Sequence, residues 1–138
     1  MAREILVDAG AWIAIAYRGD ENHAEAVAFY ERLLWEKRPL VTTNLIVAEA
    51  NVMIRRYSGH QAAIGFLDSI RQSSRLTRIY SDAALEVEGE KTLRRYADQD
   101  FSLADAVSFA VMQQRGITEA FAFDGHFATA GFVVVPTV

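Results

Sequence analysis

The stretch "EILVDAGAWIAIAY", residues 4–17, decides the fold. Its apolar run, Ile5 to Val7, is typical of a short strand that is buried on both faces, as strands of parallel sheets are. Asp8 ends the run, and the residues that follow it, up to Tyr17, suit a short helix. A buried strand that leads directly into a helix predicts an α/β protein with an acidic side chain at the carboxyl end of the strand.

The rest of the chain repeats this alternation. Further strands are expected at residues 39–42, 75–80, 118–123 and 131–135, and further helices at 21–38, 43–57, 60–74, 82–97 and 103–115. Thr43 or Asn44 can cap the helix that ends near Tyr57, and Gly116 can end the last helix. Strands that alternate with helices form a mostly parallel sheet covered on both faces. We therefore expect residues 1–138 to form a single domain with a three-layer α/β/α fold and a sheet of about five strands.

The composition limits the class of protein. Half of the 138 residues are hydrophobic and none is cysteine, which argues against disorder and excludes a disulfide scaffold or a thiolate metal site. The apolar run near the N-terminus is too short for a signal peptide or a membrane span, so we expect a cytoplasmic protein. The net charge of −4 gives no general attraction for a polyanion. Arg55 and Arg56 are weak candidates for RNA binding, although such clusters are more often solvated helix faces.

Two aspartates follow buried strands. Asp8 ends the first strand, and Asp124 ends the fourth in "AFAFDGHF", directly before a glycine. Because ligands of α/β sheets sit outside the carboxyl ends of the strands, the two carboxylates can share one rim of the sheet. The alternative for each is a turn aspartate whose side chain holds the loop, and taken alone each aspartate favours that alternative.

Two further acids lie on helices. Glu49, in "NLIVAEANVMI", has only apolar neighbours three and four positions away, which places it on the stripe expected to face the core. A glutamate is rarely buried unless it is paired with an arginine or bound to metal, and we expect the second. Asp105 lies at the entrance of an almost wholly apolar helix. Since Ser102 and Asp105 have the spacing of a capping box, Asp105 also has a purely structural alternative.

The four acids together indicate a metal site. Four carboxylates on one rim repel one another strongly unless cations neutralise them. Oxygen ligands, without cysteine and without a pair of histidines, suit Mg²⁺ or Mn²⁺. We therefore expect Asp8, Glu49, Asp105 and Asp124 to be catalytic ligands of a divalent metal ion.

The order of these acids on an alternating α/β chain resembles the PIN domain family and, within it, the VapC-type ribonuclease toxins. The motifs that carry the resemblance are "ILVDAGAWIAI", "TTNLIVAEANVM", "DFSLADAVSFAVM" and "AFAFDGHF", and they span the chain. The resemblance implies a hydrolase, a metal-dependent endoribonuclease that uses Mg²⁺ or Mn²⁺ to cleave single-stranded or loop RNA. It also implies a homodimer and a small antitoxin protein that inhibits the enzyme.

Three more side chains belong to the expected site. Asp100 matches an auxiliary acid of the family, and Ser102 either caps its helix or orients a ligand, with capping the expected role. Many members have a serine or threonine where this chain has Ala9, and a second acid where it has His126. His126 could bind metal, contact the scissile phosphate or cap the next turn, and the last is the role we expect.

Other classes of protein fit parts of the pattern. A phospho-acceptor signalling domain has a similar order of layers but needs a lysine near the end of the last strand, whereas the lysines here are Lys37 and Lys91. A catalytically silent PIN-like module that only binds a partner is a second alternative, which a nuclease assay would separate. A solitary RNA-processing nuclease is a third, and a small neighbouring open reading frame would favour a toxin–antitoxin pair over it.

Overall fold

The computed structural model describes residues 3–137, and in this part of the chain five parallel strands form one sheet in the order β3-β2-β1-β4-β5. The strands are β1 (Ile5–Val7), β2 (Leu40–Thr43), β3 (Leu76–Ile79), β4 (Glu119–Phe121) and β5 (Val133–Val135). Each lies within a predicted strand or overlaps it. The predicted parallel sheet is therefore confirmed.

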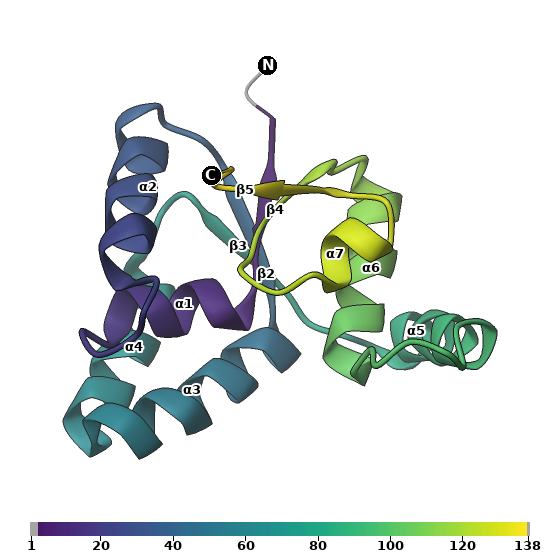
Figure 1. Cartoon of the computed structure of the whole chain (residues 1–138), viewed down its shortest axis with the longest axis horizontal. Coiled ribbons are helices and arrows are strands. Elements are labelled where there is room, and N and C mark those ends of the chain that lie inside the picture. The colour runs from purple at the N-terminus through teal and green to yellow at the C-terminus, as the bar shows by residue number, and fades with distance from the viewer. Residues whose placement is uncertain (1–2, 138) are drawn as a thin grey trace.

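Helices cover both faces of this sheet (Figure 1). They are α1 (Ala9–Ala16), α2 (His23–Trp35), α3 (Asn44–Ser58), α4 (His60–Gln72), α5 (Ala83–Arg95), α6 (Leu103–Arg115) and α7 (His126–Thr129). In Figure 1, α1, α2 and α4 lie on the left of the sheet, α6 and α7 lie on its right, and α5 packs outside α6. The three-layer prediction is confirmed. The sequence reading missed α7, because four residues are too few to show a helical period.

The helix ends follow from local hydrogen bonds. The side-chain oxygen of Thr43 accepts the N–H of Ile46 at 3.1 Å and so caps α3, as predicted. Asn44 has a different role, because its Oδ1 accepts the N–H of Ser81 at 2.8 Å and ties α3 to the segment after β3. Gly116 ends α6 in the left-handed conformation, with φ 69°, which glycine adopts without steric cost.

The centre of the sheet is its most tightly buried part. All three residues of β1 are fully buried between β2 and β4. The Trp12 indole nitrogen donates to Thr42 Oγ1 at 3.3 Å, and Thr42 Oγ1 donates to the carbonyl of Val7 at 3.1 Å. This short chain of hydrogen bonds fixes α1 on the ends of β1 and β2. The first helix therefore begins at a rigid position directly beside the carboxyl end of β1.

The strand order also defines where a ligand site is expected. From β1 the chain goes to β2 on one side, and it returns through α5 and α6 to β4 on the other side. The carboxyl ends of β1 and β4 therefore lie at the switch point of the topology, where α/β sheets open a crevice.

No helix within residues 3–137 combines the length and the apolar character needed to cross a membrane.

Candidate metal centre

Asp8 is held at the carboxyl end of β1 by its main chain. Its N–H donates to the carbonyl of Phe121 at 3.0 Å, which joins the ends of β1 and β4. Its carbonyl accepts the N–H groups of Ala11 and Trp12 and so begins α1. The Asp8 side chain is 5% exposed and makes no capping hydrogen bond. The carboxylate does not cap α1, and it lines a pocket instead.

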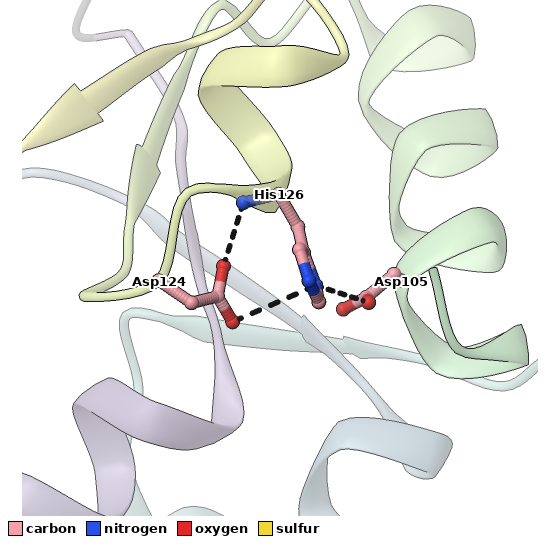
Figure 2. Close-up of side chains that lie close together, drawn as sticks. All are labelled: Asp105, Asp124 and His126. Carbon is pink, nitrogen blue, oxygen red and sulfur yellow. Dashed lines mark hydrogen bonds and ion pairs between the residues drawn. The ribbon is translucent and has the colours of Figure 1, made fainter. Parts of the chain in front are cut away.

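Asp124 lies beyond the carboxyl end of β4 and has two roles. Its Oδ1 accepts the N–H of His126 at 3.0 Å, which is the turn interaction expected of an aspartate before a short helix. Its Oδ2 lies 3.9 Å from His126 Nδ1 (Figure 2). One oxygen thus holds the loop, and the other faces the side chains of the pocket.

Asp105 combines the structural and the site role that the sequence left open. The Ser102 hydroxyl accepts the N–H of Asp105, and Asp105 Oδ2 accepts the N–H of Ser102, both at 3.0 Å. This reciprocal pair is the predicted capping box at the start of α6. The same Oδ2 lies 2.8 Å from His126 Nδ1, and Asp105 is 7% exposed. Capping therefore fixes the carboxylate in the pocket, and Ser102 has the capping role that we expected.

His126 does not have the role predicted for it. The N-cap of α7 is Gly125, and the first N–H of the helix is accepted by Asp124 and not by the His126 side chain. The imidazole instead lies between Asp105 and Asp124, as Figure 2 shows. Ligand atoms of these three residues all lie within 4.8 Å of one another. The ring orientation is set by the fold, because Asp124 fixes its main chain and Phe101 packs edge-on against it at 5.6 Å between ring centroids.

The expectation that Glu49 faces the core is wrong. Its side chain is exposed, so it does not face the core. The buried residues of α3 are Ile46, Val47, Ala50 and Ile54. Glu49 lies on the neighbouring stripe with Val52 and Met53, which line the pocket. The helical period of the sequence does not distinguish the stripe of α3 that faces the core from the stripe that lines the pocket, because both stripes are apolar around Glu49.

One pocket of about 520 Å³ collects these side chains. Its acids are Asp8, Glu49, Asp100, Asp105 and Asp124, and Ser102 and His126 also line it. The apolar part of the wall comes from Ile13 on α1 and from Val52 and Met53 on α3, which the sequence reading did not assign to the site. The pocket thus contains all four predicted acids. Asp105 and Asp124 meet His126 at a single point, whereas Asp8 and Glu49 lie on the surrounding wall.

The pKa values of the pocket reflect crowded negative charge. Burial and the charge of Asp124 raise the pKa of Asp8 to about 7, although the backbone N–H of Ala9 opposes this shift. Desolvation, followed by the charges of Asp105 and Asp124, raises the pKa of Glu49. Partial burial alone would lower the pKa of His126, but its hydrogen bond to Asp105 and the nearby carboxylates raise it. The acids are therefore short of compensating positive charge.

This donor set fits a divalent cation. Among the pocket-lining residues within 3–137 there is no lysine or arginine, and His126 is the one basic side chain. Carboxylates that face one another without a basic partner are stabilised when a hard cation binds between them. Asp8, Asp105 and Asp124 offer oxygens from fixed main-chain positions, and Glu49 on α3 offers oxygens to the same pocket.

Arg55 and Arg56 lie outside this pocket. Both are exposed at the end of α3, where Arg55 Nη1 lies 2.6 Å from His60 Nδ1. Arg56 Nη1 lies 4.0 Å from the sulfur of Met53, a residue of the pocket wall. Arg56 therefore borders the pocket wall without lining the pocket, whereas Arg55 contacts His60 on α4.

Comparison with known proteins identifies the family. Residues 5–133 match the PIN domain, and the chain belongs to this family. The 23S rRNA-specific endonuclease VapC20 of Mycobacterium tuberculosis is 37% identical over 133 residues, which cover 95% of this chain and 97% of VapC20. The crystal structure of that VapC20, described as a toxin that cleaves the sarcin–ricin loop, matches with a TM-score of 0.83 and covers 94% of this chain and 96% of its own. FitAcB from Neisseria gonorrhoeae shares the fold, with a TM-score of 0.63 at 19% identity and 96% of each chain covered.

These relationships confirm three predictions made from the sequence. The family is the PIN domain family, the fold is its parallel α/β sheet, and the enzyme class is an endoribonuclease of the VapC toxin type. PIN nucleases depend on metal, in agreement with the acidic group found here.

Proposed function

We propose that this chain is the toxin of a toxin–antitoxin pair and that it cleaves an exposed loop of large-subunit ribosomal RNA. The observation that carries the proposal is the collection of five carboxylates in one pocket without an arginine or lysine among its described lining residues. The 37% identity to VapC20 over nearly the whole chain supports the RNA target. A loop is a suitable substrate, because proteins read RNA most readily where its bases are unstacked.

In this proposal Asp8, Asp105 and Asp124 hold Mg²⁺ or Mn²⁺, and Glu49 completes the set. A bound divalent ion supplies a Lewis acid for phosphodiester hydrolysis. The protein contributes the positions of the acids: β1 and α1 fix Asp8, and the Ser102 capping box fixes Asp105. Asp100 is exposed at the mouth of the pocket and serves as an auxiliary acid.

RNA affinity has to come from local positive charge, since the chain carries −4 overall. Arg55 and Arg56 supply such charge on the α3 side of the pocket. A second candidate is Arg95, which lies in a basic cluster that the sequence alone did not separate from a solvated helix face; its guanidinium lies 5.4 Å from the centre of the Tyr96 ring. Tyr96 packs against Phe101, the ring that also contacts His126. An arginine paired with an exposed tyrosine suits stacking of an unpaired base.

The same pocket suits inhibition by an antitoxin. Its mouth combines carboxylates with the apolar side chains of Ile13, Val52 and Met53. We propose that a small antitoxin places an arginine among the acids and packs apolar side chains on this wall, because one guanidinium can bind two carboxylate oxygens at once. The homodimer implied by the family remains part of this proposal. Co-purification from the native operon tests it, and recovery of the toxin alone with full activity would count against the antitoxin.

The nuclease proposal is tested with purified protein and an RNA hairpin that carries the sarcin–ricin loop. We expect cleavage with Mg²⁺ or Mn²⁺, loss of cleavage with EDTA, and products that end in 5′-phosphate and 3′-hydroxyl groups. A control hairpin with a scrambled loop should be cut more slowly. Cleavage that survives EDTA, or products with 2′,3′-cyclic phosphate, would exclude the metal-dependent hydrolysis. Absence of any cleavage would favour the silent module.

A further inference from the structure

His126 brings a nitrogen donor to a pocket whose other charged ligands are oxygens. Its Nδ1 lies 2.8 Å from Asp105 Oδ2 and 3.9 Å from Asp124 Oδ2. Both carboxylates belong to the proposed metal site, and the ring points to the space between them (Figure 2). The side chain is therefore placed where a cation shared by Asp105 and Asp124 would meet the imidazole.

This placement is fixed by the fold and is not needed for the local turn. The main chain of His126 is held by Asp124, and the N-cap of α7 is Gly125, so the imidazole is not used to cap the helix. The imidazole also forms a T-shaped contact with Phe101, whose ring packs against Phe109 in the core. A ring that is fixed from two sides loses little freedom when it binds a ligand, which favours ligation over a loose surface contact.

We infer that His126 is a nitrogen ligand of the bound metal ion and shifts the preference of the site from Mg²⁺ toward Mn²⁺. The inference rests on the metal site of the proposed function. Both ions bind carboxylates, but Mg²⁺ binds almost only oxygen, whereas Mn²⁺, as a transition-metal ion, accepts an imidazole among its oxygen ligands more readily. Ligation through Nδ1 uses a neutral ring, so the proton of the His126–Asp105 hydrogen bond would be released to solvent.

The test reads the ligand directly. Pulsed electron paramagnetic resonance of the Mn²⁺-loaded protein detects magnetic coupling between Mn²⁺ and a bonded nitrogen. We expect nitrogen coupling in the wild type, a changed coupling pattern when the histidines carry ¹⁵N, and no coupling in His126→Asp. His60→Asn is the matched control, because His60 is exposed on α4 outside the pocket, and it should keep the coupling.

Metal affinities give a second readout. Titrations without RNA should show that His126→Asp and His126→Gln lower the ratio of Mn²⁺ to Mg²⁺ affinity by about tenfold, which corresponds to about 1.4 kcal/mol. The glutamine variant separates the loss of nitrogen from the added negative charge of aspartate.

The outcomes separate this inference from the proposed function. Mn²⁺ binding without nitrogen coupling in the wild type would overturn the inference and leave the metal site intact. Coupling that persists in both His126 variants would also overturn it. A wild-type protein that binds no Mn²⁺ or Mg²⁺ would overturn both the inference and the proposed function.

Discussion

The two ends of β1 and β4 carry the same kind of residue in opposite electrostatic settings. At the amino ends of these strands, Glu4 precedes β1 and Glu119 begins β4, and each is paired with arginine. Arg115 donates to both oxygens of Glu4, at 3.1 and 2.7 Å, and Arg38 donates to Glu119 at 3.0 Å. At the carboxyl ends, Asp8 and Asp124 line a pocket whose described residues include no arginine or lysine.

The acids at the amino ends stabilise the fold through their arginine partners. The acids at the carboxyl ends lack such partners and are available to bind a ligand. A carboxylate with an arginine partner has its charge compensated within the protein. At the carboxyl ends, burial raises the pKa of Asp8 to about 7, and the negative charge of Asp124 adds to the shift. Removing an acid should therefore have opposite consequences at the two ends of the sheet.

The largest effect is expected for Asp105→Asn, which should reduce RNA cleavage by about a thousandfold, because a metal ligand contributes several kcal/mol to the transition state. Its amide oxygen can still accept the N–H of Ser102, so the cap survives. With one negative charge fewer, the variant should melt at or above the wild-type temperature in EDTA. Added Mg²⁺ or Mn²⁺ should raise the melting temperature of the wild type much more than that of the variant.

Asp68→Asn is the control for this experiment, because Asp68 is exposed on α4 outside the pocket. It should leave both cleavage and the metal response unchanged. A fully active Asp105→Asn protein with a normal metal response would return Asp105 to a purely capping role.

The second effect concerns pH in the absence of metal. The pKa of Asp8 is about 7 in the folded protein and about 3.9 in an unfolded chain. Between these values the folded state keeps a proton that the unfolded state releases, so the free energy of unfolding falls as pH rises. Over pH 5 to 8 this contribution is about 3 kcal/mol. The raised pKa of His126 acts in the same direction, because its stabilising protonated form is lost as pH rises.

Urea denaturation in EDTA at several pH values measures this contribution. Asp8→Asn should lose clearly less stability than the wild type between pH 5 and 8, and saturating Mn²⁺ should reduce the loss in the wild type. If the two proteins show the same dependence on pH, burial and neighbouring carboxylates do not make the negative charge of Asp8 unfavourable, and this account of the carboxyl ends is wrong.

The sequence predicted most of this arrangement, for reasons that are visible in single residues. Asp8 and Asp124 could be placed because each follows an apolar strand, and Asp105 because it lies at the entrance of an almost wholly apolar helix. The exposure of Glu49 could not be predicted, since a helical stripe that lines a pocket is as apolar as one that faces the core. The orientation of the His126 ring depends on Asp124 and on Phe101, which is distant in sequence, and no local pattern reports that contact.

A third change tests the amino ends of the strands. Glu119→Gln leaves Arg38 without its charged partner, and both side chains are only 16% exposed. We expect a loss of about 2 kcal/mol in the free energy of unfolding, because a largely buried guanidinium keeps its charge but loses its strongest acceptor. Cleavage per folded molecule should stay at the wild-type level. Reduced cleavage by a fully stable Glu119→Gln protein would show that an acid at the amino ends also contributes to catalysis. The distinction between the two ends of the strands would then be lost.

The smallest effect is expected for Glu4→Gln. Arg115 and Glu4 are 36% and 26% exposed, so water already screens their charges. The contact is nevertheless bidentate and joins the start of β1 to the end of α6, which keeps it geometrically fixed. We expect a loss below about 1 kcal/mol that shrinks at high salt, together with unchanged cleavage. Urea denaturation at low and high salt measures it. A loss as large as that of Glu119→Gln, or one that salt does not reduce, would mean that the pairing itself, rather than its burial, sets the stability of the amino ends.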